Sequence, residues 1–200
     1  MLKRLNQKTK RNSRPMSEGK VLSDEVLMLK LSQGNLEACS VLFERYHVRL
    51  YNFFLRSTQN QSLSQDLTQV VFERLLKYKS SYKNGKNFRS WIYQMARNAQ
   101  ADHFNKRQNR VSDFVQPDDT AALIKPVSSQ IEAAENNEQL HRALAKLNPE
   151  YREVIVLTKL QKIRGREVAE ILECTEGAVK VKVHRAMKEL RKQFFKLDTV

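Results

Sequence analysis

The chain has 200 residues, of which 40% are hydrophobic, enough for one medium domain or two small ones with buried cores. Its 36 Lys and Arg residues outnumber its 22 Asp and Glu residues, and the formal charge of +14 indicates a polyanionic partner, by default nucleic acid. No run approaches the roughly 18 apolar residues that a membrane-spanning helix needs, and no apolar signal core begins the chain, so we expect a cytoplasmic protein without membrane insertion.

The sequence carries no signature of catalysis or of a metal site. Cys39 and Cys174 lie far apart, without a CxxC pair or a histidine at metal-ligand spacing, so we expect neither a disulfide framework nor a zinc site. A glycine-rich phosphate loop, HExxH and GxSxG are also missing from the sequence. We therefore predict a protein that is not an enzyme and that uses no metal or cofactor.

The predicted elements begin after a basic tail. Residues 1–20 contain seven Lys or Arg residues against one Glu, with little apolar periodicity, which favours a flexible tail. Ser23 is a suitable N-cap for a first helix that ends at Gly34. Apolar spacing predicts three further helices, over about residues 36–56, 63–79 and 88–107, and no strand.

The third predicted helix has an apolar side and a mixed side. Its expected core residues are Leu63, Leu67, Val70, Val71 and Leu75. The opposite side carries Gln65, Asp66, Gln69, Phe72, Glu73 and Leu76. Two large apolar residues on a polar side favour a partner surface, but Phe72 and Leu76 can equally pack against the first helix of the same domain.

The fourth predicted helix also has two distinct sides. Ile92, Ala96, Ala99 and His103 share one side, where we expect His103 to be a core residue. A second stripe consists of Trp91, Gln94, Asn98, Asp102 and Asn105. Its amide, carboxylate and indole groups suit an unstacked base, although a single Trp at helical spacing is more often a core residue, and Tyr82 in the preceding loop is equally open. The basic cluster over residues 106–110 is expected to meet phosphates.

A change in composition then divides the chain. Residues 111–134 lose apolar periodicity and contain Pro117 and Pro126, which predicts a flexible linker between two domains. The second domain is predicted over residues 135–196. Its first helix breaks at Asn148, a suitable N-cap before Pro149, and the next helix runs over about residues 150–161.

Residues 166–172 and a helix that starts near Glu176, with Thr175 as its N-cap, have helix-turn-helix spacing. The second helix has an apolar side formed by Val179, Val183, Ala186 and Leu190. A lysine-rich helix alone is more often a solvated surface helix, but the cap, the turn spacing and the one-sided charge favour DNA binding. We predict base contacts from Val181, His184 and Arg185, and phosphate contacts from Lys180, Lys182 and Lys188.

Three segments, in this order and spacing, resemble the extracytoplasmic-function (ECF) class of bacterial sigma factors in the sigma-70 family. They are DLTQVVF at residues 66–72, FRSWIYQMARN at residues 88–98 with Asp102 and His103 following, and residues 147–186, which include LNP, GAVK and HRA. The resemblance implies an all-α fold of two small helical domains joined by a flexible linker. These are a four-helix region 2 over residues 21–110 and a helix-turn-helix region 4 over residues 135–196.

The same resemblance implies a sigma factor that binds core RNA polymerase and directs promoter recognition and transcription initiation at a specific regulon, with an anti-sigma factor as a further expected partner. The implied core-polymerase contacts are Asp66, Gln69, Phe72, Glu73 and Leu76. The implied minus-ten contacts, where a flipped base is held, are Tyr82, Lys83, Asn84, Lys86, Trp91, Asn98, Asp102, Lys106 and Arg107. The implied minus-thirty-five contacts, in duplex DNA, are Gly177, Lys180, Val181, Lys182, His184, Arg185 and Lys188.

Several positions depart from the family pattern. Val70 replaces a common acidic residue, which implies a shifted or weaker polymerase contact. Glu173 replaces the usual turn glycine and has to accept a positive φ, at a cost of roughly 1 kcal/mol, if the turn keeps its shape. Lys162 opens a loop that begins with glycine in the family, which leaves the shape of that turn open.

Two other functions remain open on the sequence alone. A sigma-like adaptor that never contacts promoters is one, and the basic recognition helix argues against it. A dimeric helix-turn-helix regulator is the other, and the segments over residues 66–72 and 88–102 argue against that.

Overall fold

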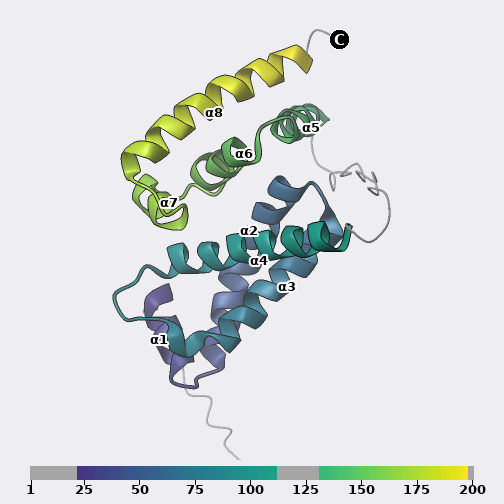
Figure 1. Ribbon diagram of the computed structural model, residues 1–200. Coiled ribbons are helices and arrows are strands. Elements are labelled where there is room, and N and C mark those ends of the chain that lie inside the picture. Colours follow the sequence, from purple (N-terminus) through teal and green to yellow (C-terminus); the bar gives the residue numbers. More distant parts are fainter. Residues whose placement is uncertain (1–21, 112–130, 198–200) are drawn as a thin grey trace, which may run out of the picture.

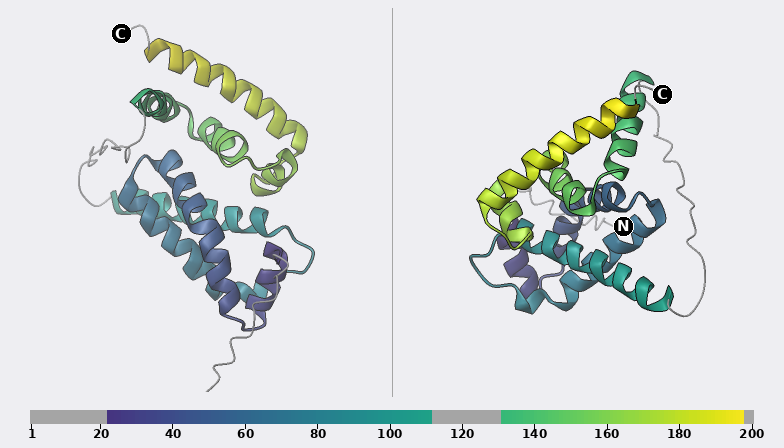
Figure 2. Two further views of the ribbon diagram at one scale, coloured as in Figure 1. Left: turned by 180° about the vertical axis from the view of Figure 1, so that it is seen from behind. Right: turned by 45° about the horizontal axis from the view of Figure 1, so that its top comes forward.

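The computed structural model describes residues 22–111 and 131–197, with side chains over 22–106 and 138–196, and the regular structure in these ranges is entirely helical. Helices α1 to α4 form a first unit, and α5 to α8 form a second unit that lies against it (Figure 1). The views in Figure 2 agree that α4 lies beside the second unit. The predicted all-α fold class is confirmed.

The first unit contains four helices and one short 3-10 turn. They are α1 (Asp24–Ser32), α2 (Glu37–Thr58), α3 (Gln61–Lys77), η1 (Lys79–Ser81) and α4 (Phe88–Val111). Side chains fix two of the starts: the Ser23 hydroxyl accepts from the Val26 N–H at 3.4 Å, and Asn60 Oδ1 accepts from the Leu63 N–H at 2.9 Å. The Ser23 cap is therefore confirmed.

The core of the first unit lies between α2, α3 and α4. Its largest fully buried side chains include Tyr46, Phe53, Phe54, Phe88 and Tyr93. From α3, Leu67, Val71 and Leu75 are buried and Leu63 and Val70 are partly buried, as the apolar spacing predicts. Rings that meet edge to face, such as Phe53 and Tyr93 with centroids 5.5 Å apart, add a directional attraction to the burial of apolar area.

The prediction for His103 is wrong. Buried residues of α4 end at Ala99, and residues 101–106 are all exposed, His103 among them. Its ring contacts only Phe104, with centroids 5.7 Å apart, in the described ring contacts. Apolar spacing in a sequence does not show where the neighbouring helices stop covering that side. The prediction therefore placed the end of the core one helical turn too late.

The second unit contains α5 (Ile131–Ala145), α6 (Pro149–Ile155), a π-helical turn η2 (Val156–Leu160), α7 (Gly165–Ile171) and α8 (Glu176–Leu197). The predicted caps are confirmed: Asn148 Oδ1 accepts from the Glu150 N–H at 2.9 Å, and Thr175 Oγ1 accepts from the Ala178 N–H at 3.2 Å. The single helix predicted over residues 150–161 is instead divided between α6 and η2, where the Gln161 N–H bonds five residues back to the Val156 carbonyl.

The two residues that replace family glycines at the turns of the second unit both have a positive φ, which a glycine adopts easily. Glu173, between α7 and α8, has φ +53°, and Lys162, between η2 and α7, also has φ +53°. The expectation that Glu173 accepts a positive φ is confirmed, so the helix-turn-helix keeps its shape at the cost of local strain.

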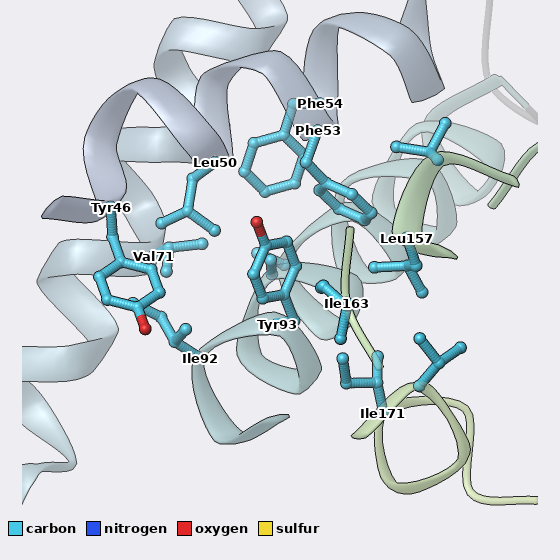
Figure 3. Packing of buried hydrophobic residues seen from close by; sticks show 14 of the residues in the cluster. Tyr46, Leu50, Phe53, Phe54, Val71, Ile92, Tyr93, Leu157, Ile163 and Ile171 are labelled. Atoms are coloured by element: carbon cyan, nitrogen blue, oxygen red, sulfur yellow. The ribbon is translucent and has the colours of Figure 1, made fainter. Parts of the chain in front are cut away.

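One hydrophobic core extends across both units. Figure 3 shows Phe53 and Tyr93 of the first unit beside Leu157, Ile163 and Ile171 of the second. All five are buried, Tyr93 with 1% of its surface exposed. Sequence reasoning predicted two domains on either side of a linker and did not predict this shared packing.

Candidate nucleic-acid and partner interfaces

The outer side of α3 is polar, with a neighbouring apolar patch on α2. Asp66, Gln69, Glu73 and Leu76 are exposed, and Gln69 Nε2 donates to Glu73 Oε1 at 2.9 Å. Phe72 is only 7% exposed and its ring contacts Phe43, with centroids 4.8 Å apart. The surface that Phe72 was expected to supply is therefore largely covered within the first unit.

Phe43 is a member of this surface that sequence reasoning missed. It is 43% exposed and stacks on His47, with centroids 4.8 Å apart. The signal in the sequence was weak, because Phe43 follows the buried Leu42 and a pair of adjacent apolar residues does not reveal which one faces outward.

The loop before α4 is held by aromatic packing. Tyr82 is buried, its ring meets Trp91 with centroids 5.2 Å apart, and its hydroxyl donates to the Lys86 carbonyl. Burial, followed by the charges of Glu25 and Asp24, raises the pKa of Tyr82 to about 12. Tyr82 and the partly buried Trp91 thus shape the loop.

Three polar residues of this loop are exposed to solvent. They are Lys83, Asn84 and Lys86. With Tyr82 packed beneath them, the two lysines are the groups of the loop that can meet a phosphate.

The predicted polar stripe of α4 divides between solvent and the second unit. Asn98 and Asp102 are exposed, and Asp102 Oδ2 accepts from Arg74 Nη2 at 2.8 Å. Asn98 lines a pocket of about 270 Å³ between α4 and α6, with Arg97 and Glu153. Lys106 is exposed, and the side chain of Arg107 lies outside the described residues.

Arg74 is a second residue that sequence reasoning missed. It lies on α3, 28 residues before its partner, and holds the Asp102 carboxylate from the neighbouring helix. Such a pair has no signature in a helical wheel, because each wheel describes one helix only.

The two sides of α8 are those that the wheel predicts. Val179, Ala186 and Leu190 are buried. The exposed residues of the predicted DNA-binding set are Gly177, Lys180, Val181, His184, Arg185 and Lys188. Lys182 is half-buried and its Nζ lies 3.1 Å from Glu150 Oε2, and Lys180 Nζ lies 3.3 Å from Glu176 Oε1, so two of the predicted phosphate contacts are already paired with carboxylates.

Neither a metal site nor a membrane span is found over the part of the chain that the structure describes. No three His, Cys, Asp or Glu side chains there are grouped so that they could hold an ion. The helices of the described ranges are also too short or too polar to cross a bilayer. Cys39 and Cys174 are both free, and burial raises the pKa of the Cys39 thiol.

Comparison with known families decides between the functions left open by the sequence. Residues 42–110 match the family Sigma-70 region 2, and residues 137–190 match the family Sigma-70, region 4. The chain belongs to the sigma-70 family. As an RNA polymerase sigma factor, it binds core polymerase and directs promoter recognition and transcription initiation.

Two curated relatives are themselves RNA polymerase sigma factors, and the second is named as a member of the ECF class. The chain is 28% identical over 173 residues to the RNA polymerase sigma factor CarQ of Myxococcus xanthus. The aligned segment covers 86% of this chain and 97% of CarQ. The chain is 27% identical over 162 residues to the ECF RNA polymerase sigma factor SigX of Bacillus subtilis (strain 168). The aligned segment covers 78% of this chain and 83% of SigX. The ECF class that the resemblance implied is confirmed.

Two solved structures share the fold of the sigma factor. One is CnrH, solved in complex with the cytosolic domain of CnrY. Its structure matches this chain with a TM-score of 0.64 and 23% sequence identity, and the match covers 88% of this chain and 97% of CnrH. The other is the sigma factor RpoE of Bartonella quintana, solved in complex with the anti-sigma factor NepR. Its structure matches this chain with a TM-score of 0.66 and 22% sequence identity, and the match covers 80% of this chain and 97% of RpoE.

Proposed function

We propose that residues 21–110 of this sigma factor, as region 2, bind the polymerase and hold the melted minus-ten element, while residues 135–196, as region 4, bind duplex DNA at the minus-thirty-five element. The protein itself catalyses no reaction, since the polymerase performs the phosphoryl transfer, and it acts with the polymerase in the bacterial cytoplasm. One observation supports these two roles: α8 exposes a basic side, which suits duplex DNA, and α4 exposes a polar side, which suits single-stranded bases.

The duplex-binding half of the proposal rests on the shape of α8. A recognition helix enters the major groove with base contacts near its amino end and phosphate contacts around them. Val181 is 50% exposed beside His184 and Arg185, so a thymine methyl group is a suitable contact for it. Lys188 supplies charge for phosphates, and Lys180 and Lys182 join it once Glu176 and Glu150 release them.

The single-strand half of the proposal rests on Asn98 and Asp102. An exposed amide and an exposed carboxylate can pair with the edge of a base that has left the duplex. Unstacking a base costs a few kcal/mol, and a site that binds only the flipped base recovers this cost and favours the open promoter. Lys83, Asn84, Lys86 and Lys106 lie on the exposed surface near either end of this stripe, with Arg107 next in sequence.

The polymerase contact is proposed on the outer side of α3. Asp66, Gln69, Glu73 and Leu76 are exposed there, and Phe43 adds an apolar area next to the buried Phe72. Charged residues around an apolar centre are the usual composition of a protein interface. An anti-sigma factor is proposed as a further partner, because the structural relative RpoE was solved with the anti-sigma factor NepR.

Run-off transcription tests the proposed function directly. The purified chain is added to sigma-free core polymerase with a library of bacterial promoters, and defined transcripts are expected that core polymerase alone does not produce. If no promoter gives a transcript while a known sigma factor is active in the same assay, the proposal fails.

A substitution in the proposed minus-ten site separates promoter opening from promoter binding. Asn98→Ala is expected to reduce permanganate reactivity of the melted strand more than it reduces binding of the holoenzyme to the closed promoter. Gln61→Ala, which removes an exposed amide at the start of α3, is the control and is expected to change neither. Normal melting by the Asn98→Ala protein contradicts the assignment.

A further inference from the structure

The loop between η1 and α4 is closed by two hydrogen bonds. The Tyr82 hydroxyl donates to the Lys86 carbonyl, and the Lys86 N–H donates to the Lys83 carbonyl at 3.2 Å. Gly85 has φ +85°, a conformation that residues with a Cβ atom rarely adopt, so the chain turns back at this residue. The exposed side chains of Lys83, Asn84 and Lys86 are therefore carried on a turn of defined shape.

Aromatic packing fixes this turn to the start of α4. The Tyr82 ring meets the rings of Trp91 and Phe88, with centroids 5.2 and 6.2 Å apart. Phe88 is fully buried, and its ring also meets that of Tyr46 on α2, with centroids 5.2 Å apart. Because Phe88 and Trp91 both lie at the start of α4, the position of the loop depends on where the first turn of that helix is held.

Two side chains accept from backbone N–H groups at the start of α4, and they come from different parts of the chain. Asn87 Oδ1 accepts from the Ser90 N–H at 2.8 Å, as a local N-cap. Glu25 Oε1, from the first turn of α1, accepts from the Phe88 N–H at 3.3 Å. Glu25 lies 63 residues before Phe88 in the sequence, so no local pattern connects the two.

The carboxylate of Glu25 also acts on the tyrosine of the loop. Burial is the largest cause that raises the pKa of Tyr82 to about 12, and the charge of Glu25 is the next, so the hydroxyl stays protonated and remains a donor at neutral pH. Asp24, beside Glu25, binds Arg45 and Tyr46 of α2. The first turn of α1 is thereby fixed to α2 and, through Glu25, holds the start of α4.

We propose that Glu25 is a positioning residue for minus-ten recognition, which fixes the amino end of α4 and with it the shape of the loop over residues 82–86. The exposed side chains of the loop then meet the melted strand in one geometry. The inference rests on the proposed function of region 2 and adds α1 to it, although Glu25 itself touches no base in this role.

The expected effect follows from the population of the fitting loop shape. A loop that samples several shapes binds its preferred base only in proportion to the fraction that has the fitting one. Binding to a base that does not need this geometry changes less. Loss of the contact between Glu25 and Phe88 therefore lowers the discrimination between bases.

Two substitutions at Glu25 separate its hydrogen bond from the rest of its side chain. Glu25→Ala removes the acceptor for the Phe88 N–H, whereas Glu25→Gln keeps an amide oxygen there and is the rescuing variant. Glu37→Ala is the matched control. Glu37 is likewise an acid in the first turn of a helix of the first unit, but it is exposed and forms no ion pair or side-chain hydrogen bond in the described part of the chain.

Each full-length variant is assembled with core polymerase, and permanganate footprinting measures the rate of promoter opening. Two promoters are compared: one that the wild type transcribes in the run-off assay, and the same promoter with a substitution at the minus-ten base on which the wild type depends most. The ratio of the two opening rates is the discrimination. Binding of the holoenzyme to the closed promoter is measured in parallel.

We expect Glu25→Ala to reduce the discrimination about tenfold, which corresponds to a loop with the fitting shape in about one molecule in ten. Glu25→Gln and Glu37→Ala are expected to stay close to the wild type, and closed-promoter binding is expected to be the same in all of them. Unchanged discrimination by Glu25→Ala overturns the proposal. An equal loss in closed-promoter binding also overturns it, because the damage would then extend beyond the loop.

A second variant keeps the test decisive if Glu25→Ala disturbs folding. Tyr82→Phe keeps the ring that packs on Phe88 and Trp91 and removes only the donor to the Lys86 carbonyl. It is expected to lower the discrimination in the same direction, whereas Tyr78→Phe, at a tyrosine that is 46% exposed, is expected to leave it unchanged. Wild-type discrimination by Tyr82→Phe contradicts the proposal.

The wild type distinguishes a failure of this inference from a failure of the proposed function. If the wild type opens promoters and discriminates between minus-ten bases, and the Glu25→Ala and Tyr82→Phe proteins do so equally well, only the positioning role is overturned. If the wild type starts no transcript, the proposed function fails, and the positioning role fails with it.

Discussion

Arg152 closes the turn between α5 and α6 with a single guanidinium group. Its nitrogens donate to the carbonyls of Leu144, Ala145 and Leu147, at 2.8, 2.6 and 3.1 Å. Its Nη1 donates at 2.8 Å to the carbonyl of Ser57, near the end of α2. One side chain thus satisfies the last carbonyls of α5 and also links the two units.

Arg152→Lys is expected to lower the free energy of unfolding by about 2 kcal/mol, because an ammonium group cannot reproduce the planar fork of donors. Urea unfolding followed by circular dichroism measures this. Arg166→Lys is the control: that side chain is 87% exposed and its carboxylate partner lies 3.9 Å away, so almost no change is expected. Equal losses in the two variants would contradict the role given to Arg152.

A substitution at Glu173 is expected to increase stability, in contrast to Arg152→Lys. Because its φ is +53°, Glu173→Gly is expected to raise the free energy of unfolding by about 1 kcal/mol. Glu170→Gly, just before the last residue of α7, is expected to lower the same quantity by about 1 kcal/mol. Thermal unfolding of both variants checks this, and a destabilised Glu173→Gly protein would exclude strain at the turn.

Sequence reasoning works well at the scale of the residue where the cause is local. The caps at Ser23, Asn148 and Thr175 depend on atoms two or three residues away, and all three are formed. The pair between Arg74 and Asp102 depends on how α3 and α4 are placed, which no local pattern contains. The same limit explains why Phe43 was missed.

At the scale of the element, α5 meets α2 through two basic groups. His141 Nδ1 and Arg56 Nη1 are both buried without a hydrogen-bond partner in the described part of the chain. Burial, together with the positive charge of Arg56, lowers the pKa of His141 below its ordinary value of 6.5. Burial also lowers the pKa of Arg56. The neutral form of His141 therefore suits this contact.

Stability is expected to fall in mildly acidic solution for this reason. Since the pKa of His141 is lower in the folded than in the unfolded protein, the unfolded protein binds more protons below about pH 6.5, and unfolding becomes more favourable there. Urea unfolding between about pH 7.5 and 5.5 measures the trend, which His141→Gln is expected to flatten. A variant with the same pH dependence as the wild type would exclude His141 as the cause.

The helices themselves were largely predictable, because apolar spacing and caps act within each one. The division of residues 150–161 into α6 and η2 was not, since a π-helical turn keeps nearly the same sequence pattern as an α-helix. His103 shows the complementary error, in which the apolar pattern continues after the neighbouring helix has stopped covering it.

At the scale of the whole molecule, the shared core predicts cooperative unfolding. Calorimetry of the wild-type chain is expected to show one transition, because Tyr93 of the first unit and Leu157 of the second are buried in one core. Gln161→Ala removes the hydrogen bonds to Tyr93 and Arg49 without changing the core of either unit, and it is expected to separate the transition into two. Two transitions in the wild type would contradict the shared core.

Sequence reasoning predicted two helical parts and missed their docking for a physical reason. Leu157 and Ile171 lie in helical turns and Ile163 lies in the loop between them, and the apolar pattern of the sequence does not say which surface covers them. Likewise, Glu153 and Glu167 look like ordinary solvent-exposed acids until α4 is placed beside them.

The pairing of Arg89 and Arg97 with acids of the second unit also affects how that unit meets DNA. Glu153 and Glu167 place carboxylates, each paired with an arginine, on the side of the second unit that faces α4, whereas the exposed cations of α8 belong to a different side. A duplex is therefore attracted to the α8 surface and not to the side that carries these acids. This polarity favours a single docking orientation before any base pair is read.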